Sequence, residues 1–556
     1  MRRIEVIAGI QYHMISRNKM HERHSEYLLK LLPMLAVLFI AFVPIDSHAS
    51  EFKLMEASIS DINTAFKEGK LTSEGLTKMY LDRIEAYDRK GPQIRAMISV
   101  NPNAAKDARA LDKERQKSGP RSALHGIPII IKDNYDTVDL PTTAGSVLLK
   151  NSRPKDDAFT VKKLRDAGAV ILGKANMSEF ALSFDRLSHS SLGGLTRNPY
   201  NLKRDVAGSS SGSAAAVAAN FAVFATGSDT AGSIRAPANV AGTVGIKPTL
   251  GLTSRDGVVP VSLSYDVTGP IARTVEDAAI ALQFMAGVDQ SDPRTLESQS
   301  WQVDDYTQYL DKNALKGARI GIARDYFGGN PEVDEAINKA IAKMRALGAT
   351  FVEINVPRDI RDAWTGMMEL VIDREIGPQL SAYLQTVPGA GPKSLDDLIQ
   401  GYKALPVESP HPIVSPARIE YYEKVAESSG VADIEYLYTV TNKLPDSRNG
   451  VVDAMDRHKL DALVFPTMPC TASPLFTNED PTYVCNVPDP WIAGYLGCVT
   501  GFPEVTVPAG MTQHGLPIGI SFYGKPYTEP RLIALAYAYE QATQARKIPP
   551  TTPPLK

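Results

Sequence analysis

The sequence predicts an α/β protein in which helices flank one large β-sheet within a single large domain. Short apolar runs, such as Ile129-Ile130-Ile131, are typical of strands that are buried on both faces of a sheet. Helical patterns separate these runs along the chain, and such alternation is typical of α/β architecture. Since 43% of the 556 residues are hydrophobic, the chain also has enough apolar side chains for one extensive core.

The first 49 residues are interpreted as an export signal. An apolar run at 35–43 follows a basic stretch that ends at Lys30, and it precedes the small-x-small sequence Ser47-His48-Ala49 that signal peptidase cleaves. The run is shorter than the roughly 20 residues that a membrane-spanning helix needs. We therefore expect cleavage after Ala49, an exported protein in the periplasm or outside the cell, and no stable membrane span afterwards. A retained anchor or a buried helix is the alternative.

Residues 50–556 are predicted to form the domain itself. Helices are expected at 58–87, where two amphipathic helices break near Gly69, and then at 160–167, 213–219, around Ile337, Ile341 and Met344, and at 531–540. Strands are expected at 129–132, 169–173, 222–225, 319–322, 351–354, 460–465 and 504–508. A loop at 227–232 follows the strand at 222–225. The segment 359–449 is mostly helical, irregular and interrupted by prolines, and we interpret it as a substrate-facing insertion.

The net charge and the spacing of the histidines exclude several classes of function. The net charge of −3 predicts no binding of nucleic acid or of an anionic membrane surface. The histidines after residue 49 lie far apart, without the spacing that places two metal ligands on one helix face, so neither a catalytic metal nor a cofactor is expected. Two interpretations remain open for Cys470, Cys485 and Cys498: one disulfide with one cysteine left over, or three small buried apolar side chains.

Two serine sites in Gly-rich sequence predict a nucleophile. Ser209-Ser210-Ser211 and Ser233 both lie within 207–237, each beside an expected helix start. Glycines cost backbone entropy and serines bury poorly unless they are hydrogen-bonded, so packing alone does not account for this stretch.

A serine needs a base, and the residues allow two arrangements. Gly208-Ser209-Ser210-Ser211-Gly212 matches the Gly-x-Ser-x-Gly nucleophile elbow, which would make the protein an α/β-hydrolase-type esterase with Ser210 and a histidine from His411, His458 or His514. The polar stretch 201–206 stands where that elbow needs an apolar strand. In the other arrangement the base is a desolvated lysine. Lys132 is the candidate, because it ends an apolar strand. The alternative interpretation is that the Lys132 side chain reaches from the strand end to solvent.

Four ordered motifs resemble the amidase signature family: Gly126-Ile127-Pro128-Ile129-Ile130-Ile131-Lys132-Asp133-Asn134, Gly208-Ser209-Ser210-Ser211-Gly212-Ser213, Gly232-Ser233-Ile234-Arg235 with Pro237, and Gly245-Ile246-Lys247-Pro248-Thr249. The resemblance extends over most of the chain after residue 49. It implies a central mixed sheet flanked by helices and a serine amidohydrolase that works through an acyl-enzyme.

The resemblance also implies residue roles. Ser233 would be the nucleophile, Ser209 the bridging serine whose preceding peptide bond is cis, and Lys132 the base. The backbone amides of Thr230, Ala231, Gly232 and Ser233 would form the oxyanion hole, with support from Ser210, Asp229 and Arg235. Ala207, Ser211 and Ala231 stand where the family often has glycine. Ala231 in particular would strain the oxyanion loop if its φ had to be positive.

Within the family, the chain is most similar to bacterial peptide amidases, which remove the amide from a peptide C-terminus. Thr196-Arg197-Asn198-Pro199-Tyr200 and Ser254-Arg255-Asp256-Gly257 carry this likeness, together with the triple serine. A small-molecule or peptide amide is therefore the expected substrate, and an exported location argues against the amidotransferase component that acts on glutamyl-tRNA. An amidase-like binding module without turnover is disfavoured because Lys132, Ser209 and Ser233 are all present.

Overall fold

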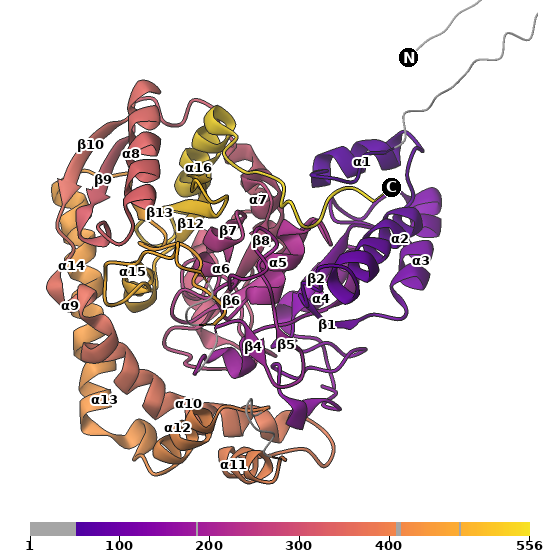
Figure 1. Ribbon diagram of the computed structural model, residues 1–556, viewed down its shortest axis with the longest axis horizontal. Coiled ribbons are helices and arrows are strands. Elements are labelled where there is room, and N and C mark those ends of the chain that lie inside the picture. The colour runs from indigo at the N-terminus through magenta and orange to yellow at the C-terminus, as the bar shows by residue number, and fades with distance from the viewer. Residues whose placement is uncertain (1–51, 185–186, 407–412, 477–479, 556) are drawn as a thin grey trace, which may run out of the picture. The chain divides into compact units, whose positions relative to one another are not determined.

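An 11-stranded mixed sheet organises the protein, for which this computed structural model describes residues 52–184, 187–406, 413–476 and 480–555. Its strand order is β1-β3-β2-β6-β8-β7-β12-β13-β11-β9-β10 (Figure 1). Pairing is parallel in β3-β2-β6 and in β11-β9-β10, and antiparallel between these groups. The prediction of a single large α/β domain with helices around a mixed sheet is confirmed.

The strands of the sheet are β1 (Met97–Val100), β2 (Pro128–Lys132), β3 (Val170–Ala175), β6 (Phe224–Asp229), β7 (Val244–Lys247), β8 (Val267–Ala272), β9 (Arg319–Ala323), β10 (Thr350–Ile354), β11 (Ala462–Pro466), β12 (Glu504–Met511) and β13 (Pro517–Tyr523). A separate two-stranded ribbon contains β4 (His189–Ser190) and β5 (Gly194–Leu195). The α-helices are α1 (Ile59–Lys67), α2 (Ser73–Arg83), α3 (Ala104–Ser118), α4 (Phe159–Asp166), α5 (Ser211–Ala218), α6 (Arg235–Val240), α7 (Val275–Met285), α8 (Pro331–Ala346), α9 (Arg358–Arg361), α10 (Glu369–Thr386), α11 (Leu395–Lys403), α12 (Pro416–Ala426), α13 (Ile434–Tyr438), α14 (Leu444–Arg457), α15 (Ile492–Thr500) and α16 (Glu529–Thr543).

The small-residue helix α5 lies against the sheet at β2, β3, β6 and β8. All of its side chains are buried. Gly212 allows the closest approach, because a Cβ there would come within 2.4 Å of the Asn176 carbonyl oxygen. Close packing of α5 fixes the position of the triple serine at its start.

The sequence prediction is wrong at the end of β6. Residues Gly227–Asp229, expected in a loop, continue the strand and pair with β8 from Gly227↔Gly269 to Asp229↔Val267. Glycine and aspartate rank low in strand propensity, but the pairing of residues 227–229 with β8 decides their conformation. The ladder therefore carries the chain up to the reactive loop at 230–233.

The segment 359–449 is folded into helices α9 to α13 and the greater part of α14, together with the π-helical turn Trp364–Met368. In Figure 1, α10, α11 and α12 lie together at one end of the sheet domain, and contacts join all three helices. Their apolar side chains, such as Leu380, Leu398 and Tyr422, form a hydrophobic cluster separate from the cluster around the sheet.

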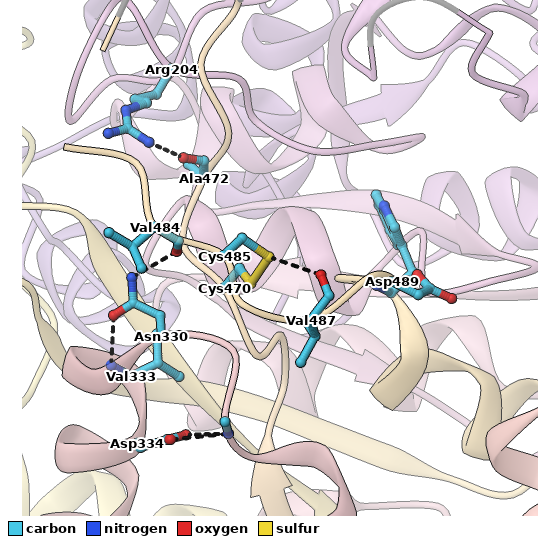
Figure 2. The surroundings of a disulfide bond; sticks show 12 residues. Arg204, Asn330, Val333, Asp334, Cys470, Ala472, Val484, Cys485, Val487 and Asp489 are labelled. Carbon is cyan, nitrogen blue, oxygen red and sulfur yellow. Dashed lines mark hydrogen bonds between the residues drawn. A yellow bond between two sulfur atoms is a disulfide. The ribbon is translucent and has the colours of Figure 1, made fainter. Parts of the chain in front are cut away.

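Cys470 and Cys485 form a disulfide, and Cys498 is free and buried (Figure 2). The first of the two open interpretations of the cysteines therefore holds. Among the described residues, no helix has the length and apolar character to cross a bilayer. The expected export signal, with Ala49, lies outside the described residues.

Candidate active site

Lys132 reaches the catalytic region from the end of β2. Its Nζ atom lies 2.8 Å from Ser209 Oγ and 2.9 Å from Ser228 Oγ. Ser228 belongs to β6, the strand next to β2, so strand pairing brings lysine and serine together. The Lys132 side chain is fully buried, so the alternative that it extends from the strand end to solvent is wrong.

Burial also sets the charge state of Lys132. An ammonium group loses its hydration in the interior, and this desolvation lowers the pKa of Lys132 to about 7. The carboxylates of Asp229 and Asp266 act in the opposite direction, because each favours the protonated lysine. A lysine with a pKa in this range is neutral in an appreciable fraction of molecules at pH 7 and can accept a proton.

Ser209 lies between Lys132 and the cavity described below. The Gly208–Ser209 peptide bond is cis, as the resemblance implied, and the Ser178 amide donates to the Ser209 carbonyl oxygen at 3.1 Å. Ala207 precedes this bond with a φ of 54°, whereas Ala231 has no positive φ. The expected place of backbone strain is therefore corrected: of the two alanines, Ala207 takes the left-handed conformation.

Ser210 and Ser211, unlike Ser209, make no hydrogen bond with Lys132 and do not line the cavity. Ser210 Oγ donates to the Ser228 carbonyl oxygen at 3.2 Å, and the Ser210 amide donates to the Ser233 carbonyl oxygen at 3.2 Å. Ser211 Oγ is buried without a hydrogen-bond partner in the described chain. Ser210 thus ties the triple serine to both β6 and the loop of Ser233, which is a supporting position.

The nucleophile-elbow alternative finds no support here. The stretch 201–206 forms turns and irregular chain rather than a strand. The residues that line the described cavity include Ser209 and Ser233 but neither Ser210 nor any histidine. His458 and His514 are exposed, and His411 lies outside the described residues.

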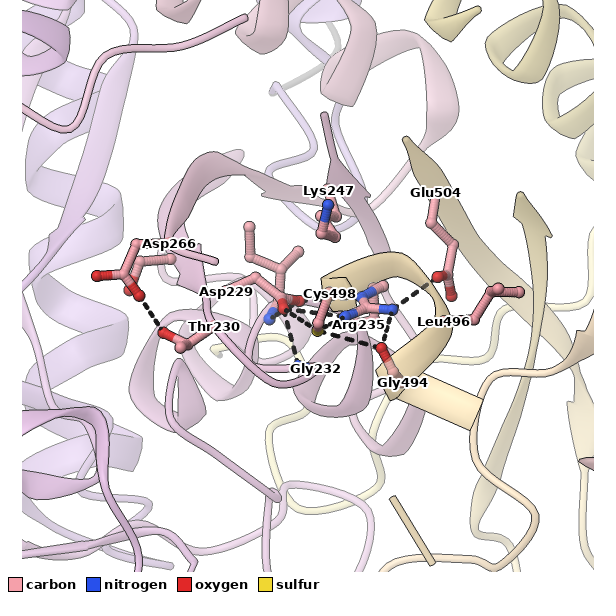
Figure 3. Close-up of polar contacts among 12 residues, drawn as sticks. Asp229, Thr230, Gly232, Arg235, Lys247, Asp266, Gly494, Leu496, Cys498 and Glu504 are labelled. Carbon is pink, nitrogen blue, oxygen red and sulfur yellow. Dashed lines mark hydrogen bonds and ion pairs between the residues drawn. The ribbon is translucent and has the colours of Figure 1, made fainter. Parts of the chain in front are cut away.

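The loop after β6 is held by Asp229 (Figure 3). Its carboxylate accepts from the Gly232 amide at 2.8 Å and from the Ile234 amide at 2.9 Å. The Gly232 amide is therefore engaged in this structure, and its place in the oxyanion hole stays a prediction. The amides of Thr230, Ala231 and Ser233 have no acceptor among the described residues and stay free to bind an oxyanion. Gly232 itself has a φ of 108°, a conformation that requires glycine.

Arg235 connects this loop to β12 and α15. Its guanidinium donates to Asp229 at 3.0 Å, to Glu504 at 2.6 Å and to the Gly494 carbonyl oxygen at 2.9 Å (Figure 3). Burial alone would raise the pKa of Asp229, but the adjacent Arg235 holds it well below its usual range. The charged pair keeps the Asp229 carboxylate available to the Gly232 and Ile234 amides.

Two residues of this centre were missed by the sequence reasoning. Ser228 orients the lysine, because its Oγ also accepts from Asn134 Nδ2 at 3.0 Å. Glu504 completes the ion pair of Arg235. The signal for Glu504 was a carboxylate in the otherwise apolar strand sequence at 504–508, which requires a buried partner.

A cavity of about 370 Å³ opens over these groups. Gly208, Ser209, Thr230, Ala231 and Ser233 line one part of it. The Ser233 hydroxyl makes no hydrogen bond with any described residue. The other walls are mainly apolar and aromatic, with two carboxylates: Ala181, Leu182, Ser183, Phe184, Leu187, Val261, Trp364, Glu369, Ile372, Asp373, Tyr421, Trp491 and Tyr495. Five of these wall residues belong to the segment 359–449.

The chain is similar in sequence to several known proteins. The family model named Amidase matches residues 75–533. A protein named "probable amidase" from Arabidopsis thaliana is 36% identical over 512 residues, which cover 90% of this chain and 93% of that protein. The A-type subunit of glutamyl-tRNA(Gln) amidotransferase from Microcystis aeruginosa is 37% identical over 506 residues, with 89% and 99% covered.

Solved structures give the same result. The X-ray structure of native peptide amidase from Stenotrophomonas maltophilia superposes with a TM-score of 0.78 at 38% identity. The match covers 89% of this chain and 98% of that protein. The match therefore extends over nearly the whole length of that protein.

Proposed function

We propose that this chain, which belongs to the amidase family and is an amide-hydrolysing enzyme, cleaves carboxylic amides or peptide C-terminal amides through an acyl-enzyme at Ser233. One observation carries the proposal: the 2.8 Å contact between Lys132 Nζ and Ser209 Oγ, next to a cavity that Ser209 and Ser233 both line. A buried lysine with a lowered pKa is the base that a serine nucleophile needs in the absence of a histidine.

In the proposed cycle, neutral Lys132 accepts the proton of Ser209 while Ser209 accepts the proton of Ser233. The Ser233 Oγ atom then forms a bond to the amide carbon, and the carbonyl oxygen becomes an oxyanion. Free amides at Thr230, Ala231 and Ser233 donate to that oxyanion. The proton returns through Ser209 to the leaving amine, the C–N bond breaks, and water hydrolyses the resulting ester. Proton-transfer contacts such as Ser233–Ser209 commonly tighten only when substrate binds.

The acyl side of the substrate is assigned to the aromatic walls of the cavity. The peptide amidase from Stenotrophomonas maltophilia supports a peptide C-terminal amide as substrate. The cavity wall offers apolar contacts from Phe184, Trp364 and Trp491 to the side chains of such a peptide.

Hydrolysis of a substrate panel tests the proposal. Peptide amides, aryl and aliphatic amides, fatty acid amides and glutamine are incubated with the enzyme, with Ser233→Ala protein as the blank. A fluorophosphonate probe should attach to Ser233, and mass spectrometry of the labelled peptide identifies the residue. If the probe reacts nowhere and no amide is hydrolysed, the chain is a binding module; if Ser210 is labelled, the esterase alternative is correct.

The proposed base predicts a specific pH dependence. Protonated Lys132 cannot accept a proton, so kcat/KM should fall about tenfold per pH unit below a pKa of about 7 and level off above it. Asp266 favours the charged lysine, so Asp266→Asn should shift this limb to lower pH. Initial rates measured across the neutral range check both statements. A profile that is flat through neutral pH, or that falls as pH rises through it, would exclude Lys132 as the base.

Export is proposed on separate grounds. The apolar run at 35–43 and the Ser47-His48-Ala49 site support it, and so does a disulfide, since disulfides persist in oxidising compartments. N-terminal sequencing of the protein from its native host should begin at Ser50. A mature protein that still carries residues 1–49 would contradict cleavage.

A further inference from the structure

The Cys470–Cys485 disulfide joins two stretches of chain, one of which contacts the Ser209 segment and the other the oxyanion loop. We name residues 470–476 the first arm and residues 480–491 the second arm. The sulfur atoms connect the start of the first arm to the middle of the second (Figure 2). The proposed reaction does not use this disulfide, and its role is therefore a separate question.

The first arm is bound to the segment that carries Ser209. The Asp205 amide donates to the Ser473 carbonyl oxygen at 2.9 Å, and the Leu475 amide donates to the Lys203 carbonyl oxygen at 2.9 Å. The Ser473 hydroxyl donates to Asp205. The same carboxylate accepts from the Ala207 amide at 3.1 Å, directly before the cis peptide bond. The first arm and the Ser209 segment are thus one hydrogen-bonded unit.

The second arm ends on the oxyanion loop. Asp489 accepts from the Trp491 amide at 2.8 Å, and this turn directs the indole towards Gly232. The ring packs on that glycine, since a methyl group added there would lie 3.4 Å from Trp491 Cε3. Trp491 also lines the cavity beside Ser233. The second arm therefore touches the loop whose amides face the oxyanion.

Polar contacts also hold the second arm: Arg204 Nη2 donates to Thr482 Oγ1 at 3.1 Å, and the Trp491 carbonyl oxygen accepts from the Gly494 amide at 2.8 Å at the start of α15. Arg204 binds both arms, through the Ala472 carbonyl oxygen at 2.6 Å and through Asp480 Oδ2 at 2.8 Å. Asn330 Nδ2 donates to the Val484 carbonyl oxygen at 2.9 Å (Figure 2). The Asn486 amide donates to the Gly329 carbonyl oxygen at 2.7 Å. The side chains of Thr482, Val484 and Asn486 are not buried. The disulfide is the one covalent cross-link in this exposed stretch.

We infer that the Cys470–Cys485 disulfide is a positioning element for catalysis: it fixes Trp491 on the oxyanion loop relative to the Ser209 segment. The inference rests on the proposed function, because it concerns the same serines and amides. Breaking the bond lets the second arm move relative to the first. Trp491 then leaves Gly232 unsupported for part of the time, and the oxyanion donors lose their alignment with Ser233. Sub-ångström misplacement of this kind commonly slows an enzyme, and about a tenfold loss is expected.

Reduction of the folded enzyme tests the inference. A phosphine reductant breaks the S–S bond: the two sulfurs take up two electrons and two protons, and phosphorus is oxidised to phosphine oxide with an oxygen atom from water. The rate of labelling by a small alkyl fluorophosphonate is measured before and after reduction, because this probe needs the nucleophile and the oxyanion donors but not the full cavity. Titration of the released thiols confirms reduction, and circular dichroism confirms that the fold persists.

Two variants make the test specific. Cys470→Ser/Cys485→Ser protein should be labelled about tenfold more slowly than oxidised wild type and should not respond to the phosphine. Trp491→Leu protein should also be slow, and reduction should slow it little further, because the contact through which the disulfide acts is already gone. If the double variant does not fold, reduction of the wild type alone decides the matter.

The outcomes separate this inference from the proposed function. Oxidised wild type that is labelled at Ser233 and loses rate on reduction supports both. Equal labelling rates before and after reduction, with the thiols released, would overturn the positioning role and leave the amidase proposal intact. A slow reduced enzyme whose Trp491→Leu variant slows by the same further factor would also overturn it, because the effect then does not pass through Trp491. Oxidised wild type that neither labels nor hydrolyses any amide would refute the proposed function itself.

Discussion

Ser233→Ala protein is expected to lose amide hydrolysis almost completely, with kcat lowered by about 10⁴- to 10⁶-fold, because no other group can form the acyl-enzyme. The structure supports a selective effect. The Ser233 hydroxyl faces the cavity and makes no hydrogen bond with the described residues, so its removal costs the fold little. Rates on the best amide of the panel and thermal unfolding, measured on the same preparation, check the two halves of this expectation.

Neighbouring serines supply matched controls for Ser233→Ala. Ser211→Ala removes a hydroxyl that has no partner in the described chain and should leave activity near that of the wild type. Ser210→Ala loses the contact with the Ser228 carbonyl oxygen, so a moderate loss is expected. If Ser210→Ala were inactive and Ser233→Ala active, the nucleophile would have been assigned to the wrong serine.

Lys132→Met is the second variant with a large expected effect. It removes the proposed base while filling a similar volume, and kcat/KM should fall by about 10²- to 10⁴-fold. The acid limb near pH 7 should vanish with it, because that limb reports the titration of Lys132. Circular dichroism and thermal unfolding should show that the sheet survives, since methionine remains apolar in a fully buried position.

Lys247 is a second buried lysine whose titration would also lower kcat/KM near neutral pH, so its substitution is the control. Burial and the nearby Arg235 lower the pKa of Lys247 to about 8. Its Nζ atom donates to the Phe502 carbonyl oxygen at 3.0 Å, and Lys247 does not line the cavity. Lys247→Met should reduce stability but keep the acid limb. Loss of the limb in Lys247→Met protein, with the limb retained in Lys132→Met protein, would reverse the assignment.

The sequence predicted the parts of the centre that depend on local pattern. Three consecutive isoleucines predicted the strand that Lys132 ends, and Gly-rich sequence predicted the loops of Ser209 and Ser233. The missed strands depend on tertiary pairing instead. β8 contains Gly269 and Pro270, which hide its strand character, and β6 extends to Asp229 because its last residues pair with β8.

Other features of the site could not be read from one sequence. Cys470 and Cys485 are 15 residues apart in the sequence, but the spacing of three cysteines does not determine which two of them form a disulfide. The hydrogen bond from the Gly232 amide to the Asp229 carboxylate, at 2.8 Å, was not predicted. Trp364, Tyr421 and Trp491 meet in one cavity wall although they come from distant segments. Such meetings depend on how the helices pack, which local patterns do not specify.

The separate hydrophobic cluster of the helical segment has a consequence for evolvability. Trp364, Ile372 and Tyr421 belong to the helical segment, whose apolar cluster also includes Phe180, Tyr265 and Tyr495, whereas Lys132, Ser209 and Ser233 are set by the sheet and its loops. Substitutions in this wall can alter which acyl groups fit while the reacting atoms keep their places. Exchange of single wall residues is therefore a better route to new amide selectivities than exchange of the whole segment, because Glu375 and Tyr383 of the segment also accept from Ser262 and donate to Asp136, respectively, outside it.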